Sequence, residues 1–252
     1  MKKSFARFAF VASLAAVLFT GCGGGKSADN LRMITEATFP PYEFLRGTEI
    51  VGIDVEICRA VAKEMGKGLV VEDAKFDSVI PALIAGKADI AAAGITVTED
   101  RKAKVDFSIP YVSTGVVIIY KKASPYLKGE EAKGKKVGVQ SGTTSDTYCV
   151  DNLKQEPERF DSPAAAVAAL KAGKVDLVIA DIDPAKNCVK GEADLAISDF
   201  ITKEDYAVAI RKGNPEFLAK VNKAITQLKK SGELDALVAK FTAEADKLKE
   251  AN

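Results

Sequence analysis

The sequence predicts an α/β fold in which two similar lobes are joined by two crossover strands and face each other across a cleft. Two observations support this prediction. Short strand-like runs alternate with amphipathic helical stretches along most of the 252 residues, which is typical of a mainly parallel sheet covered on both faces. One stretch of this pattern also occurs twice in the chain.

The repeated stretch is Ala82–Ala93, which recurs as Ala169–Ala180 at an offset of 87 positions with seven of twelve residues identical. In each copy a helix is expected to end at Ala-Gly, before a Lys-x-Asp turn and a short buried strand. The alternative is that this is only a common turn between a helix and a strand, since glycine at a helix end has a general cause. If the repeat is real, Gly94 to Thr96 and Asp181 follow corresponding strands, where open α/β sheets bind ligands.

The expected elements follow from hydrophobic periodicity and turn residues. Strands are predicted at 31–35, 69–71, 88–93, 112–120 and 206–210, and helices at 52–66, 76–87, 143–153, 214–230 and 234–248. The strands at 112–120 and 206–210 are the expected crossovers. They divide the chain into a first lobe of residues 31–114 plus 207–252 and a second lobe of residues 115–206.

The first 30 residues are predicted to lie outside the two lobes. Residues 1–21 have the charged start, short apolar core and small-residue exit of a secretory signal peptide. Phe19–Cys22 resembles the lipobox of bacterial lipoproteins, which makes Cys22 the expected lipid anchor and residues 22–30 a flexible tether. A plain cleavable signal with an incidental cysteine is the alternative. We expect an exported protein, periplasmic or on the outer cell surface, attached to the membrane through its N-terminal lipid.

Composition excludes several classes of function. The chain has no histidine, so Ser-His-Asp and Cys-His catalysis and histidine-ligated metal sites are excluded. Without residues 1–21, 33 basic side chains stand against 35 acidic ones, a balance that lacks the basic patch of a nucleic-acid-binding protein. We expect no cofactor, no metal and no nucleic-acid partner.

Three cysteines besides Cys22 are an odd set for an exported protein. Cys58 lies on the apolar face of a predicted helix and suits a buried thiol. One disulfide plus this thiol is the economical expectation, which would join Cys149 to Cys188. Two free thiols are the alternative that the sequence leaves open.

Two charged residues have the chemistry needed to hold a free amino acid, whose carboxylate and ammonium groups cannot be buried without partners. Arg101 offers a planar fork of donors for the carboxylate, and Thr98 before it has the position of a helix N-cap. Asp181, in the opposite lobe, can receive the ammonium group, while Asp183 is expected to face solvent. Taken alone, each charge is more often an ordinary surface residue.

Ordered motifs lie at residues 36–44, 52–56, 76–83, 93–101, 105–108, 135–144 and 210–214. Together they resemble the polar amino acid class of bacterial extracellular solute-binding proteins, family 3, over nearly the whole chain after the tether. The resemblance implies a type II periplasmic binding protein with two Rossmann-like lobes and the ligand in the cleft between them. It also implies the substrate-binding component of an ABC importer, whose permease subunits are then the expected partners.

The same resemblance implies a role for each residue of the cleft. Arg101 takes the ligand carboxylate together with the backbone N–H groups of Thr96 and Thr144. Asp181 and the Gly94 carbonyl take the ammonium group, assisted by the Thr96 hydroxyl. Phe39 and Phe76 hold the ligand side chain between their rings, and Glu36 and Gln140 lie at its far end, where specificity is set. Ala93 and Thr143 are the remaining ligand-binding residues.

The identity of the amino acid stays open between glutamine and a basic amino acid such as arginine or lysine. The Glu36 carboxylate can pair with a basic side chain, although family members with other ligands also carry an acid there. The segment Ala93–Thr96 is more similar to glutamine-binding members, since Ala93 replaces a serine common in binders of basic amino acids.

Capture of a free L-amino acid and its delivery to an ABC transporter is therefore the leading hypothesis, and we expect no enzymatic activity. An exported dehydratase on the same scaffold is one alternative, because Glu36 remains as a spare carboxyl group. A ligand-sensing module for a separate receptor is the other.

Overall fold

The computed structural model describes residues 30–251, so the predicted signal peptide and Cys22 lie outside the described residues. The first lobe is built on a five-stranded sheet of order β5-β1-β6-β14-β7. Its strands are β1 (Asn30–Thr35), β5 (Gly68–Asp73), β6 (Ile90–Ala91), β7 (Val105–Phe107) and β14 (Ala209–Arg211). β1 is parallel to β5 and β6, whereas β14 is antiparallel to β6 and β7.

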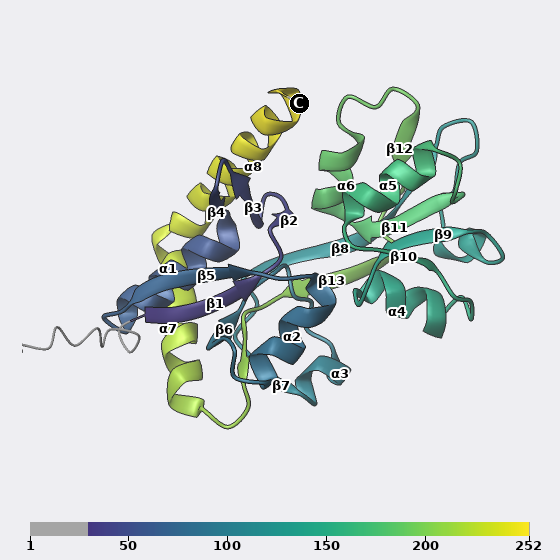
Figure 1. The fold of residues 1–252 in the computed structure, drawn as a ribbon. Coiled ribbons are helices and arrows are strands. Elements are labelled where there is room, and N and C mark those ends of the chain that lie inside the picture. The colour runs from purple at the N-terminus through teal and green to yellow at the C-terminus, as the bar shows by residue number, and fades with distance from the viewer. Residues whose placement is uncertain (1–29, 252) are drawn as a thin grey trace, which may run out of the picture.

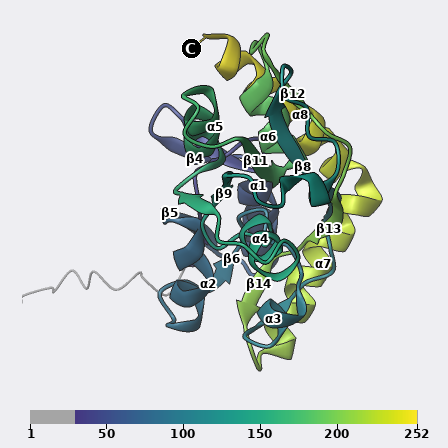
Figure 2. The same ribbon diagram turned by 90° about the vertical axis from the view of Figure 1, so that its right-hand side faces the viewer.

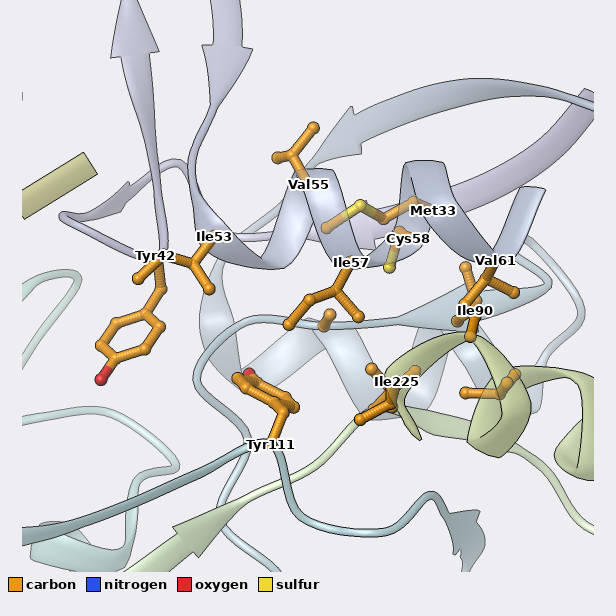
Figure 3. Packing of buried hydrophobic residues seen from close by; sticks show 14 of the residues in the cluster. Met33, Tyr42, Ile53, Val55, Ile57, Cys58, Val61, Ile90, Tyr111 and Ile225 are labelled. Atoms are coloured by element: carbon orange, nitrogen blue, oxygen red, sulfur yellow. The ribbon is translucent and has the colours of Figure 1, made fainter. Parts of the chain in front are cut away.

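Helices cover both faces of this first sheet (Figure 1). Leu31 and Met33 of β1 pack toward α1 (Ile53–Glu64), α7 (Pro215–Ser231) and α8 (Glu233–Ala251). Ile34 packs on the other side, against α2 (Phe76–Ile84). Figure 3 shows the tightly buried part of the larger cluster, around helix α1. Met33 and Ile34, which are neighbours in β1, therefore pack into cores on opposite faces of the sheet, as the alternation of side chains along a strand requires.

The second lobe has a sheet of order β10-β9-β11-β8-β12. A sixth strand, β13, pairs with the first half of β8, whereas β12 pairs with the end of β8. Its strands are β8 (Val112–Lys121), β9 (Val137–Gln140), β10 (Glu158–Phe160), β11 (Leu177–Asp181), β12 (Leu195–Ile197) and β13 (Thr202–Tyr206). Helices α5 (Pro163–Lys171) and α6 (Ile182–Val189) cover one face and α4 (Thr144–Asp151) the other. Between residues 30 and 251, no helix has the length and apolar character needed to cross a membrane.

The two copies of the internal repeat have the same local structure. Gly86 and Gly173 end α2 and α5 with φ angles of +75° and +71°, a left-handed conformation that glycine adopts without steric cost. Asp89 and Asp176 then bind the neighbouring strand in the same way. The partner is Arg32 for Asp89 and Lys136 for Asp176. In each pair the aspartate N–H donates to the partner's carbonyl, and the aspartate carboxylate accepts from the partner's N–H, at 2.8 to 3.0 Å.

The connection between the lobes consists of β8 and β13, which run side by side in both views (Figures 1 and 2). They pair antiparallel from Val112 opposite Tyr206 to Val116 opposite Thr202. The predicted lobe boundaries at residues 114 and 206 lie in or at the end of these strands. Tyr206, the last residue of β13, also forms an isolated antiparallel β-bridge with Thr96 of the first lobe.

Several features differ from the sequence predictions. The second crossover strand, expected at 206–210, is β13 at Thr202–Tyr206, because the chain then enters the first sheet as β14. The three cysteines within residues 30–251, Cys58, Cys149 and Cys188, are free, so the expected disulfide is wrong. Cys149 packs on the α4 face of the second sheet and Cys188 in the core on its opposite face. Helix α6 begins directly after Asp181, where no helix was expected. A three-stranded sheet of β2 (Thr38–Phe39), β3 (Glu43–Arg46) and β4 (Glu49–Val51), and a 3-10 helix at Gly129–Ala132, were also missed.

The repeat predicts matched core positions in the two lobes. Leu83 and Leu170 are related by the offset of 87 and are both fully buried. We expect Leu83→Ala and Leu170→Ala each to lower the free energy of unfolding by about 2 to 5 kcal/mol in urea titrations. Ile84→Ala, at an exposed neighbouring position, is the control and should change it by less than about 0.5 kcal/mol. Losses no larger than the control at either leucine would contradict the assignment of two separate cores.

Candidate functional site

Arg101 lies where the two lobes meet. The Thr98 hydroxyl caps the short helix α3 (Glu99–Lys102) by accepting from the Arg101 N–H at 3.2 Å. The guanidinium donates to the Thr96 carbonyl of the first lobe at 2.9 Å and to the Gly142 carbonyl of the second lobe at 3.1 Å. Its central carbon lies 5.4 Å from the centre of the Phe76 ring. A single cation therefore contacts both lobes and one of the predicted aromatic residues.

Asp181 ends strand β11 and is 9% exposed. Its Oδ2 accepts from the Tyr206 hydroxyl at 2.7 Å, whereas its Oδ1 is buried without a hydrogen-bond partner. Burial and the negative charge of the nearby Glu204 raise the pKa of Asp181 to about 7, against the opposing effects of the Tyr206 hydrogen bond and the positive charge of Arg101. Asp181 and Arg101 therefore interact electrostatically, and one carboxylate oxygen is left to accept a donor.

Glu204 is a residue of this site that the sequence analysis missed. Its Oε2 accepts from the Thr96 hydroxyl at 2.5 Å. Burial lowers the pKa of Arg101, and the negative charges of Glu204 and Asp181 act against that change. The crossover strand was expected at 206–210 and so did not include Glu204, which lies in β13 beside Thr96.

Gly94 follows strand β6 and has a φ of +55°. A Cβ atom at this position would lie 2.7 Å from the Phe39 ring, so only glycine fits this close approach. Phe39 itself packs against the rings of Tyr42 and Tyr206, with ring centres 5.9 and 6.4 Å away. Ala93, before Gly94, is buried. This side of the cleft is therefore a tightly packed wall of aromatic rings and backbone.

Glu36 and Gln140 meet across the cleft. The Gln140 side-chain amide donates to Glu36 at 3.4 Å and to the Asp161 carbonyl at 3.1 Å. Glu36 also accepts from the Thr38 hydroxyl. Both Glu36 and Gln140 are 4% exposed, and burial raises the pKa of Glu36. An acidic side chain is therefore buried at the predicted specificity end, with few groups to compensate its charge.

Thr143 and Thr144 lie at the start of α4 in the second lobe. The Thr143 hydroxyl caps this helix by accepting from the Asp146 N–H at 3.3 Å, and it donates to the Gln140 carbonyl at 2.8 Å. Thr144 is the first residue of the helix. Together with Thr96 and Glu204 it lines a hollow of about 770 Å³ at the junction of the lobes. A smaller hollow, of about 220 Å³, is lined by Phe76, Arg101 and Gly142 among others.

Side chains at the rim also join the two lobes. The Lys75 ammonium lies 2.9 Å from Asp161, and the Ser141 hydroxyl donates to Asp77 at 3.2 Å. On another part of the rim, the Tyr42 hydroxyl donates to Asp183 at 2.7 Å. The expectation that Asp183 faces solvent is therefore wrong, because its carboxylate is half-buried in a contact between lobes.

Comparison with known proteins gives a consistent result. The family model for bacterial extracellular solute-binding proteins, family 3, matches residues 31–244. A putative ABC transporter arginine-binding protein 2 of Escherichia coli (strain K12) is 32% identical over 240 residues, covering 90% of this chain and 97% of the relative. An ancestral arginine-binding protein bound to arginine is 40% identical with a TM-score of 0.78, covering 84% of this chain and 98% of the other. The structure of an ancestral arginine-binding protein bound to glutamine gives a TM-score of 0.77 at 40% identity, with coverages of 84% and 97%. The chain belongs to the bacterial extracellular solute-binding proteins of family 3.

Proposed function

We propose that this protein captures a free L-amino acid between its lobes and delivers it to an ABC transporter in the membrane. The observation that carries this proposal is that Arg101 and Asp181 lie at the junction of the lobes, close enough for the charge of each to act on the other. The guanidinium provides donors for a carboxylate, and the unpaired Oδ1 of Asp181 is an acceptor for an ammonium group. These are the two charged groups that every free amino acid has, and a buried site must pair both.

Closure of the lobes around the ligand is the proposed signal to the transporter. A ligand shifts the balance between open and closed forms only if it binds the closed form more tightly. The proposed contacts meet this condition, because Arg101 and Gly94 belong to the first lobe and Asp181 to the second. We propose that the permease subunits of the transporter recognise the closed form.

The preferred ligand under this proposal is an amino acid with a cationic side chain, with arginine first. Glu36 is a buried acid at the far end of the cleft, and a cationic side chain would compensate its charge. Phe76 already lies against a guanidinium, that of Arg101. The relatives named for arginine support the same choice. Glutamine is the second candidate, supported by the Gln140 amide and by the relative bound to glutamine.

The proposed charge pair leads to a direct test by thermal unfolding of residues 30–252 with each common amino acid. At a ligand concentration about 100-fold above Kd, the stabilisation should be about 2.7 kcal/mol. Arg101→Ala and Asp181→Ala should each abolish it without unfolding the protein, because each leaves one ligand charge buried and unpaired.

Matched control variants are Arg59→Ala and Asp235→Ala, at exposed positions on α1 and α8, and both should keep the full stabilisation. If stabilisation persists in both cleft variants, the site assignment is wrong. Turnover of prephenate or arogenate by the purified protein, without stabilisation by any amino acid, would instead support the dehydratase alternative.

The choice between arginine and glutamine depends on Glu36. We expect Glu36→Gln to weaken arginine binding by about 2 kcal/mol or more, roughly 30-fold in Kd, because the cationic side chain loses its buried partner. Glutamine binding should change much less, since its neutral amide can bond to either side chain. Calorimetric titration of both ligands measures the difference. Equal losses of affinity for arginine and glutamine would show that Glu36 does not distinguish a charged ligand side chain from a neutral one.

We further propose that Cys22 carries a lipid that attaches the protein to the membrane after removal of residues 1–21. The support is the short motif Phe19–Cys22 and the polar stretch that follows it. In bacterial cells, wild-type protein should then be found in the membrane fraction and Cys22→Ser in the soluble fraction. The intact mass of the wild-type protein should include the acyl chains. A wild-type mass equal to that of an unmodified cleaved chain would rule out the anchor.

A further inference from the structure

Two carboxyl groups that the proposed function does not use lie buried below the cleft. Glu43 is the first residue of β3 and Asp54 is in the first turn of α1, and both are fully buried. Burying one carboxylate is costly, and burying two side by side is more so. The structure must therefore compensate this charge in some way.

The hydrogen bonds around the pair are unequal. Asp54 Oδ2 accepts from the Gly94 N–H at 2.9 Å and from the Tyr111 hydroxyl at 2.8 Å. Asp54 Oδ1 and both carboxyl oxygens of Glu43 are buried without a donor. The two residues lie next to each other, because the Asp54 N–H donates to the carbonyl of Tyr42, the residue before Glu43, at 3.0 Å, and each carboxyl group acts on the pKa of the other. One proton held between them would satisfy an oxygen on each side and remove one of the two negative charges.

The location of that proton follows from the same contacts. The two donors to Asp54 stabilise its ionised form, whereas Glu43 has no other donor. Burial raises the pKa of Asp54 to about 6, and burial together with the negative charge of Asp54 raises the pKa of Glu43 well above its usual range. The other titratable groups facing the pair are acids or neutral donors that cannot supply a positive charge: Glu36, Tyr42, Cys58 and Tyr111.

We propose that Glu43 is a neutral carboxylic acid that donates to an ionised Asp54, and that this pair positions Gly94 for the ligand ammonium group. Gly94 is the residue whose carbonyl is expected to accept from that group, and Asp54 holds its N–H. The same carboxylate holds Tyr111, which precedes crossover strand β8 and lies in the core beneath α1 (Figure 3). Glu43 and Asp54 are therefore positioning residues, and their effect on affinity rests on the proposed function.

The proton itself can be tested without any ligand. The infrared spectrum of the wild-type protein at neutral pH should contain the carbonyl band of a protonated carboxyl group. In the difference spectrum between wild type and Glu43→Gln, one such band should be lost while circular dichroism stays unchanged, because glutamine is nearly the same size; any band from Asp181, whose pKa is raised to about 7, is common to both proteins and cancels. Loss of a carboxylate band in place of a protonated carboxyl band would overturn the proposal, since Glu43 would then be ionised.

The positioning role can be tested by the affinity for arginine or for whichever amino acid stabilises the wild type. Glu43→Gln keeps a donor toward Asp54 and should restore most of the affinity that Glu43→Met, of similar size but without a donor, loses. The loss in Glu43→Met, and in Asp54→Asn, should be about tenfold or more, as for a hydrogen bond to a charged group. Equal affinities for the Gln and Met variants would overturn the positioning role.

The two proposals fail in different ways. If no amino acid binds the wild-type protein, the proposed function fails while the infrared result still decides where the proton lies. If the wild type binds but its spectrum contains no protonated carboxyl band, the shared proton is wrong and the proposed function stands. Should Asp54→Asn not fold, the comparison of the two Glu43 variants still decides the positioning role.

Discussion

The junction between the lobes is constrained by the need to compensate charge where water is excluded. The negative charges of Asp181 and Glu204 act on the ionisation of Arg101, and the charges of Arg101 and Glu204 act on that of Asp181. Arg101 donates to two backbone carbonyls, and one oxygen of Asp181 is buried without a hydrogen-bond partner. Under the proposed function, a zwitterion would bring one negative and one positive group to these residues without changing the net charge of the junction. The scaffold of two sheets holds these groups on opposite sides of one narrow space.

Much of this scaffold could be predicted from the sequence. The repeat placed Gly94 and Asp181 after corresponding strands, and both copies have the predicted helix end and turn. Periodicity also located the long helices within one to three residues, as with α7, predicted at 214–230 and found at Pro215–Ser231. These features are local, since they depend on residues within one or two turns of the chain. Membership of the solute-binding family agrees with the fold they imply.

Most of the features that were missed depend on contacts distant in sequence. Asp183 was expected in solvent because nothing near it in the chain predicts the Tyr42 hydroxyl, 141 positions away. Helix α6 was missed although Asp181, its N-cap, is a residue type that favours a helix start, because Asp181 was considered only as a partner of the ligand. The expected disulfide failed because Cys149 and Cys188 lie in different cores, which cysteine counting cannot distinguish. Glu204 required knowing that the crossover strand passes beside Thr96.

The rim contacts bear on how a transporter tells an occupied protein from an empty one. Lys75 with Asp161, and Tyr42 with Asp183, join the lobes through protein atoms alone. Under the proposed function, an empty protein that closed easily would compete with occupied molecules for the transporter. The Lys75 and Asp161 side chains are 64% and 71% exposed, and such pairs contribute at most about 1 kcal/mol. A pair as weak as Lys75–Asp161 can keep the lobes in register once they have closed, but under the proposed function most of the free energy of closing must come from the bound amino acid.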